Sequence, residues 1–196
     1  MRRTTILLWG LFAALASITS AQTNNFQNQP TAKLLFSSDG ESLVRPRTVD
    51  DNGAAVKALP TAANIALFER AAFDMLNQKR AENGEKPLAW NESLAAVARQ
   101  HSQDMADNKY FSHRGLDDSM VGDRAERGNV KWRAIGENIA YNRGYKDPIE
   151  RAVQLWMEST GHRQNLLDDH WKESAVGIAV TPTGEFYFTQ VFLLRK

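Results

Sequence analysis

The last two thirds of the chain carry apolar residues at helical spacing. From Asn64, such residues recur at steps of three and four, which predicts an amphipathic helix that ends at Asn83-Gly84. Asn91 can cap a second helix that runs to about Asp107. Its expected inner stripe consists of Leu94, Val97 or Ala98, His101 and Met105. A third, short helix is expected over 119–127.

The rest of the chain adds helices and then changes period. Asp147-Pro148 is a helix start with an aspartate cap and a proline in the first turn. A helical turn follows over 162–167. Residues 175–180 and 185–192 are expected to be strands, joined by a turn at 181–184. This order predicts an α+β fold, with helices packed on a small antiparallel sheet.

The N-terminal third is different in character. Arg2 and Arg3 precede a short apolar run, and Ala21 ends a small-residue cleavage site, so residues 1–21 are predicted to be a secretory signal peptide. An uncleaved anchor is the alternative, although the run is short for a spanning helix. Residues 22–62 are polar and lack periodicity, which predicts a flexible linker, with a short strand or docking segment possible at 34–36. Residues 63–196 form the expected domain.

Charge and cysteine content narrow the function classes. Without Arg2 and Arg3, 22 basic residues stand against 23 acidic ones, a net charge of −1. A near-neutral chain without a basic stripe gives no electrostatic case for nucleic acid. The chain has no cysteine, which excludes disulfides, cysteine nucleophiles and cysteine-ligated zinc. Its stability must come from burial of the core.

Four short motifs occur in a specific order: YFSH at 110–113, GENIA at 136–140, WMESTGHR at 156–163 and FTQVF at 188–192. With HSQDMA at 101–106, they resemble the bacterial branch of the CAP superfamily, also called the SCP or pathogenesis-related-1 family. The resemblance covers about residues 63–196. It implies a three-layer α-β-α sandwich with a cleft lined by two histidines and glutamate.

Carried onto this chain, the resemblance makes His113, Glu137 and His162 the cleft residues. The second glutamate of many members would stand at Ser159, and Glu158, turned by about 100° on a helix, is not expected to replace it. Neutral imidazoles of His113 and His162 could hold Zn²⁺ or another divalent metal, with Glu137 as ligand or orienting group. We expect Gly136 to bend the backbone, and Glu137 to favour its ionised form beside two imidazoles.

Other polar residues have simpler interpretations. His101 is expected to be a core histidine and His170 to be solvated beside Asp168 and Asp169. Ser112 or Ser159 could pair with a histidine, but the chain has no Gly-x-Ser-x-Gly motif. Asn138 and Arg163 are expected to brace the structure, and the tryptophans Trp132, Trp156 and Trp171 to fill the core.

These expectations favour a secreted or extracytoplasmic monomer without a transmembrane anchor after signal cleavage. It would bind a lipid or other small ligand, or an envelope or host component. The alternative is a metal-assisted, protease-like hydrolase in which His113 and His162 hold the metal and Glu137 acts as general base. A structural envelope protein without a ligand is a third possibility.

Overall fold

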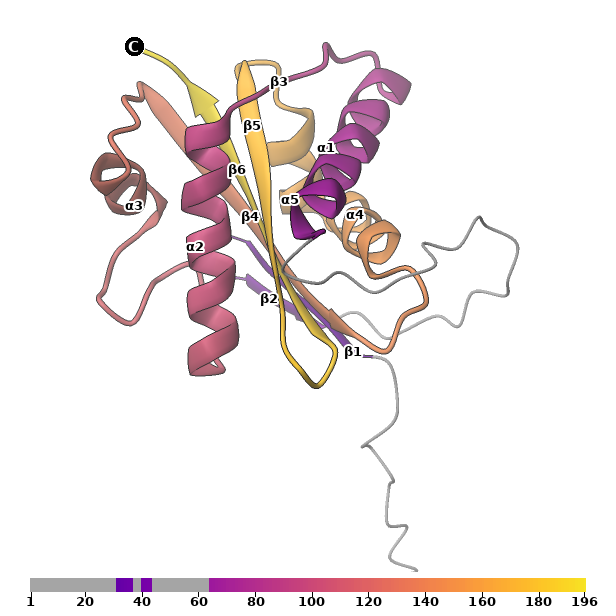
Figure 1. Cartoon of the computed structure of the whole chain (residues 1–196). Helices are drawn as coiled ribbons and strands as arrows, with labels where there is room; N and C mark the ends of the chain where they lie inside the picture. Colours follow the sequence, from indigo (N-terminus) through magenta and orange to yellow (C-terminus); the bar gives the residue numbers. More distant parts are fainter. Residues whose placement is uncertain (1–30, 37–39, 44–63) are drawn as a thin grey trace, which may run out of the picture.

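The computed structural model describes residues 31–36, 40–43 and 64–196 (Figure 1). The helices within these ranges are α1 (Ile65–Glu82), α2 (Glu92–Asn108), α3 (Val121–Arg127), α4 (Pro148–Glu158) and α5 (Thr160–Leu167). Asn91 caps α2 through Leu94 N, and Asp147 caps α4 by accepting from the backbone N–H groups of Ile149 and Glu150. The starts of all five helices were predicted within two residues.

The strands form one six-stranded sheet with the order β2-β1-β4-β6-β5-β3. They are β1 (Thr31–Phe36), β2 (Gly40–Leu43), β3 (Ala89–Trp90), β4 (Ala134–Arg143), β5 (Glu173–Val180) and β6 (Glu185–Leu194). Every pairing is antiparallel except the two-residue contact between β3 and β5, which is parallel. The sheet is therefore mixed rather than purely antiparallel.

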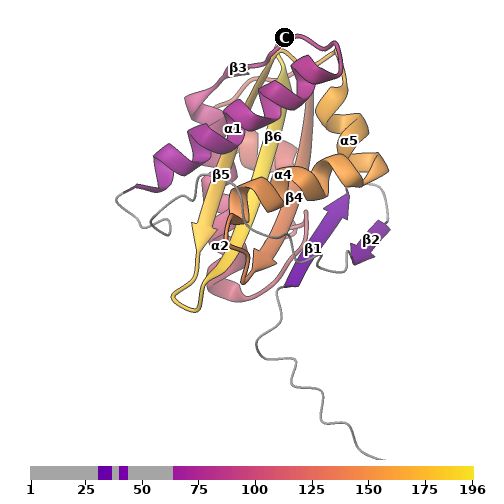
Figure 2. The same cartoon turned by 90° about the vertical axis from the view of Figure 1, so that its right-hand side faces the viewer.

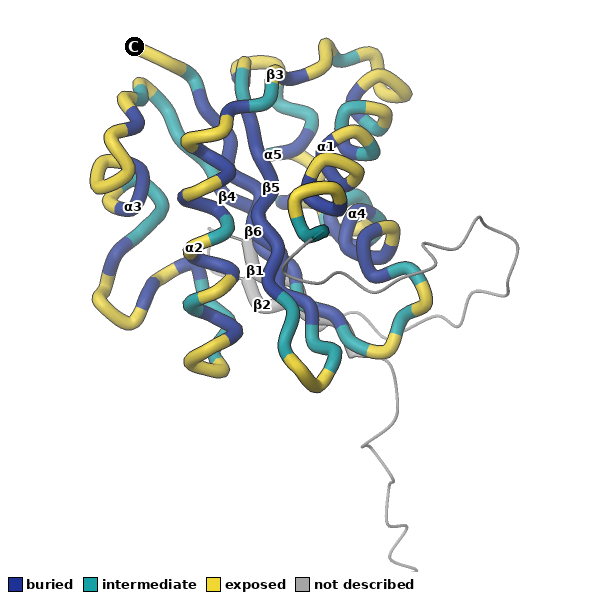
Figure 3. Tube along the Cα trace, in the orientation of Figure 1, coloured by how far each residue is buried: buried dark blue, intermediate teal, exposed yellow. Residues whose placement is uncertain are grey.

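Helices cover both faces of this sheet, which confirms the three-layer sandwich (Figures 1 and 2). On one face, α1, α4 and α5 enclose a large core that includes Trp156, Phe188 and Phe192. On the other face, α2 packs on β5 and β6, and its expected inner stripe is buried, His101 included. The central strands are accordingly buried on both sides (Figure 3).

Gly177 of β5 lies directly against the backbone of α2. A Cβ added there would lie 2.0 Å from the backbone nitrogen of Arg99 on α2. Because that neighbour is backbone rather than a flexible side chain, only glycine lets α2 lie this close to the sheet.

Part of the expected linker is regular structure. Residues 31–36 and 40–43 lie inside the range 22–62 but form β1 and β2, and β1 pairs with β4 from Leu35↔Ile139 to Thr31↔Arg143. The strand considered at 34–36 is part of β1. Backbone pairing at a sheet edge needs no apolar alternation, so residues 31–36 carry little signal of a strand in their sequence. The predicted signal peptide lies outside the described residues.

Strand β4 was missed because its polar residues break the alternation. Glu137, Asn138 and Asn142 are all buried within it. The expected bend at Gly136 is also wrong, since this residue lies in the extended ladder with β6. A Cβ at Gly136 would lie 2.9 Å from the Trp171 ring, so the glycine makes room for a tryptophan.

Candidate functional site

The first histidine of the site follows the end of α2. Lys109 closes the helix with a left-handed backbone (φ 57°), which turns the chain into the segment that carries His113. The buried His101 donates from Nε2 to the Ser112 carbonyl at 3.0 Å and so fixes the residue next to His113. The prediction that His101 is a core histidine is confirmed, and it also positions the site.

Glu137 reaches the site from β4 and is 2% exposed. His113 donates from Nδ1 to Glu137 Oε1 at 2.7 Å, and Arg124 donates to Oε2 at 2.6 Å. Burial opposes ionisation of this carboxyl, but the His113 hydrogen bond and the Arg124 charge outweigh it and hold the pKa of Glu137 below its usual value. Both carboxylate oxygens are therefore occupied.

Arg124, on α3, is a site residue that the sequence analysis missed. Besides Glu137, it donates to the carbonyls of His113 at 3.0 Å and Ser119 at 2.9 Å. The side chain is 8% exposed, so it ties the His113 segment, α3 and β4 together. Its neighbours Asp123, Glu126 and Arg127 are also charged. The sequence therefore does not distinguish the buried Arg124 from the charged residues on the exposed face of the same helix.

The second histidine lies on α5 and is 1% exposed. A 2.8 Å hydrogen bond joins His162 Nδ1 to the hydroxyl of Ser159, and Asn138 donates to the His162 carbonyl at 3.1 Å. Ser159 thus orients the imidazole from the place where many family members have glutamate. Glu158 is exposed and lies 3.5 Å from Arg151, so it does not substitute for that glutamate.

The segments that carry the two histidines are both hydrogen-bonded to β4, through neighbouring residues of the strand. Glu137 accepts from the His113 ring, and the next residue, Asn138, donates to the backbone carbonyl of His162. The three predicted cleft residues are all buried. That they line a cleft stays a prediction.

The donor set does not fit a zinc ion held by all three residues. Within the described ranges, the one group of three His, Asp or Glu ligand atoms within 4.8 Å of one another is Asp168, Asp169 and His170. Glu137 also faces the guanidinium of Arg124, whose positive charge opposes a cation there. His113 and His162 alone would supply two ligands, fewer than zinc sites use.

Other sequence candidates have structural roles. His170 is exposed and bonds Asp168, as expected for a solvated loop. Arg163 is exposed and reaches Asn83 at 3.3 Å, while Asn138 braces the His162 turn. Trp156 and Trp171 fill the core and Trp132 packs half-buried against it, which confirms that prediction.

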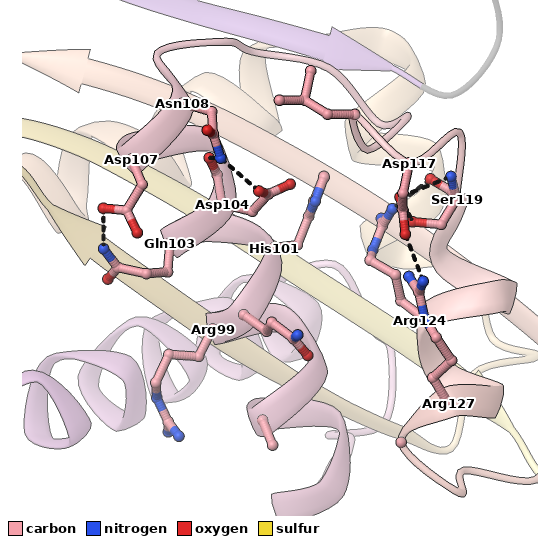
Figure 4. A pocket seen from close by; sticks show the side chains of 14 residues that line it. Arg99, His101, Gln103, Asp104, Asp107, Asn108, Asp117, Ser119, Arg124 and Arg127 are labelled. Atoms are coloured by element: carbon pink, nitrogen blue, oxygen red, sulfur yellow. Dashed lines mark hydrogen bonds and ion pairs between the residues drawn. The ribbon is translucent and has the colours of Figure 1, made fainter.

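A groove of about 1050 Å³ opens between α2 and the segment of residues 116–128. Eleven of its fourteen lining residues are polar or charged. Figure 4 shows Gln103, Asp104 and Asp107 on one side, Asp117, Arg124 and Arg127 on the other, and His101 between them. Through Arg124, one wall of the groove contacts Glu137 directly.

Comparison with known proteins identifies the domain. The family model described as CAP, cysteine-rich secretory protein family, matches residues 73–192. The membrane protein YlbC of Bacillus subtilis is 33% identical over 181 residues, 92% of this chain and 47% of YlbC. YkwD of the same organism is 30% identical over 183 residues, 88% of this chain and 68% of YkwD.

A solved structure agrees with these matches. It is an extracellular protein containing an SCP domain from Bacillus anthracis, with a TM-score of 0.59 and 35% identity. The similarity covers 71% of this chain and 45% of that chain. The chain thus spans about half the length of YlbC and of this extracellular protein.

Proposed function

Because the chain belongs to the CAP family, we propose that it is an extracytoplasmic module that binds a small polar ligand or an envelope component. The Bacillus anthracis relative is described as extracellular, and YlbC as a membrane protein. Both descriptions agree with a place at or outside the cell membrane. None of the helices in the described ranges combines the length and apolar character needed to cross a bilayer.

One observation carries the choice of binding over hydrolysis: Glu137 is held on both oxygens. A general base needs a lone pair directed at a water molecule and a pKa near the working pH. Here His113 and Arg124 occupy the carboxylate, and they hold its pKa below the usual value. This arrangement makes Glu137 a weak base and a rigid organiser of the site.

The groove between α2 and residues 116–128 supports a polar ligand. Side chains with hydrogen-bonding groups, such as Gln100, Gln103 and Asn108, line this groove and can fix the orientation of a polar ligand. Its three arginines are matched by three aspartates, so the lining is close to neutral. Amide and hydroxyl-bearing ligands, such as cell-wall glycan fragments with short peptides, suit a neutral lining of hydrogen-bonding groups.

The alternative, a metal-assisted hydrolase, would use His113 and His162 as metal ligands and Glu137 as base. A Ser159–His162 pair is the second hydrolytic option, since the two side chains are hydrogen-bonded. The sequence offers no nucleophile elbow around Ser159, and His162 is nearly fully buried. Both hydrolytic options therefore rank below binding.

Calorimetric titration tests the binding proposal. The probes are a soluble disaccharide-tetrapeptide from bacterial cell wall and, separately, oleate. We expect saturable binding of the cell-wall fragment, weakened at least about threefold by Gln100→Ala in the groove. The matched control Gln78→Ala, exposed on α1, should leave affinity unchanged. Binding of oleate alone, or equal affinities in the two variants, would contradict the proposal.

A peptidase assay tests the hydrolase alternative. We expect wild type to release no more labelled peptide than His113→Ala or His162→Ala, with or without a chelator. Metal-dependent turnover that disappears in His113→Ala would support the metal-assisted hydrolase. It would contradict the assignment of Glu137 as a weak base.

A further inference from the structure

By number, the arginines of the groove balance its aspartates, but two of these arginines are neutralised by glutamates from outside the lining. Arg99 donates to both oxygens of Glu69, at 2.9 and 2.6 Å. Arg124 donates to Glu137 at 2.6 Å. Both glutamates are buried, so solvent and salt screen these pairs only weakly. The charges of Arg99 and Arg124 are therefore not available to the aspartates of the groove.

Two aspartates of the groove accordingly have no cationic partner. Arg127, the third arginine, pairs with Asp117 at 2.5 Å, which leaves Asp104 and Asp107 on α2. Within the described residues, the carboxylates of these two accept hydrogen bonds from neutral amide and hydroxyl groups alone. The α2 wall of the groove thus carries two uncompensated negative charges.

The same wall contains a buried acceptor without a partner. His101 lines the groove, lies between its walls (Figure 4) and is 1% exposed. Its Nε2 donates to the Ser112 carbonyl, so the neutral ring has its lone pair on Nδ1. Burial lowers the pKa of His101, which keeps the ring neutral. Among the described residues, no group hydrogen-bonds Nδ1, and a buried acceptor of this kind is stabilised by a donor from a bound molecule.

All three groups on the α2 wall accept hydrogen bonds, and two of them are negative. A primary ammonium group complements them, because it carries one positive charge and three N–H donors. A bare divalent metal fits less well, since His101, Asp104 and Asp107 do not form a group with ligand atoms within 4.8 Å of one another. The charge and the spacing both favour an amine on a flexible chain.

We propose that the α2 wall of the groove, formed by His101, Asp104 and Asp107, binds a primary ammonium group of the ligand. The ammonium site rests on the proposed function, because it lies in the same groove. Neutral side chains there would bind the hydroxyl and amide groups of a cell-wall fragment, and the carboxylates would bind the side-chain amine of a diamino acid in its peptide. On the other wall, Arg124 has an Nε–H without a described partner, a donor suited to an oxygen of the same ligand.

A titration followed by NMR compares two small probes on the full chain. Nα-acetyl-lysine amide keeps the ammonium group, and Nα,Nε-diacetyl-lysine amide has an uncharged amide in its place. We expect the charged probe to bind at least about fivefold more tightly at low salt. This advantage should shrink at high salt, because salt screens the two carboxylates. The ¹⁵N signal of His101 Nδ1 should move with the charged probe and not with the acetylated one.

Conservative variants locate the ammonium. Asp104→Asn and Asp107→Asn keep the size of the side chain and remove its charge, so each should reduce the advantage of the charged probe at least about twofold. The double variant should abolish it. Asp118→Asn is the matched control, because Asp118 is exposed and lies outside the groove lining, and asparagine tolerates its positive φ of 63°. The advantage should be unchanged there, and circular dichroism verifies folding.

Several results would overturn the ammonium site. They are equal or absent binding of the two probes, and an advantage that survives in the double variant. A response of the same signals to Ca²⁺ but not to the charged probe would assign the carboxylates to a metal ion instead. An Nδ1 signal that does not move with bound amine would remove His101 from the site.

The cell-wall fragment separates this site from the proposed function. If the fragment binds but the two lysine probes bind equally, the ammonium site is wrong and the binding function stands. If the charged probe binds as expected but the fragment does not, the ammonium site stands and the proposed ligand is wrong.

Discussion

The ion pair between Arg124 and Glu137 allows a quantitative test of how the site is held. Both side chains are at least nine-tenths buried, and the guanidinium donates to the carboxylate at 2.6 Å. Arg124→Met leaves a buried carboxylate with His113 as its remaining described partner. Breaking a buried pair in this way costs about 3–5 kcal/mol, and Glu137→Gln should cost a similar amount.

The double variant decides whether the cost comes from the unpaired charge. With Met at 124 and Gln at 137, neither buried charge remains. We therefore expect the double variant to be about 2–3 kcal/mol more stable than the sum of the single effects predicts. Urea unfolding followed by tryptophan fluorescence measures all four proteins. Arg127→Met is the matched control, because its ion pair with Asp117 is exposed and is worth less than about 1 kcal/mol.

The pH dependence of the stability is an independent test of the same ion pair. In wild type the folded pKa of Glu137 is below the unfolded value of about 4.3, so its stabilising contribution is present above that pH and is lost as pH falls through the folded pKa. Without Arg124 the folded pKa rises, because burial still opposes ionisation. The penalty of Arg124→Met should therefore shrink between pH 7 and pH 4. Additive single effects together with a pH-independent penalty would refute the reasoning.

Three further changes test the packing and the protonation of the domain. Gly177→Ala should lower the free energy of unfolding in urea by at least about 3 kcal/mol, because the added Cβ would meet the α2 backbone. Gly84→Ala should lower it by about 1 kcal/mol, because Gly84 has a positive φ but no atom within 4 Å of an added Cβ. Asp147→Ala should lower stability by about 1 kcal/mol because the α4 cap is lost. Asp147→Asn should lose much less, because asparagine also caps helices. Equal losses in the two variants would disprove capping. Burial lowers the pKa of His101, so wild-type stability should fall as pH drops below about 6.5. His101→Gln should flatten that slope between pH 7 and pH 5 in thermal unfolding, while His170→Gln, in the exposed loop, should not.

The helices could be predicted because local and global signals agree in them. Asn91 and Asp147 cap the helices they were expected to cap, and the inner stripe of α2 is buried. β4 could not be predicted in the same way, since the buried amides Asn138 and Asn142 break its alternation. Each amide donates to a carbonyl, that of His162 or Pro148, across the layer. Such amides can be buried because groups from other elements accept their hydrogen bonds, and the local sequence does not show these partners.

The hydrogen bonds made by the predicted site residues could not be predicted from the sequence. The motifs led to His113, Glu137 and His162, and the structure places His113 directly on Glu137. It also supplies Arg124 and gives Ser159 a contact with His162. Neither contact has a sequence signal, because a charged residue in a short helix and a serine at a helix start are both common surface features.

The GENIA motif is best understood as a strand that serves both faces of the sheet at once. Gly136 admits Trp171, Glu137 holds His113 and Arg124 on one face, and Asn138 holds the His162 turn on the other. A one-residue slip of β4 would move every one of these side chains to the wrong face. The strand therefore needs a fixed register more than it needs apolar alternation. Its ten-residue ladder with β6 supplies that register, and β1 pairs with residues 139–143 on the other side of the strand.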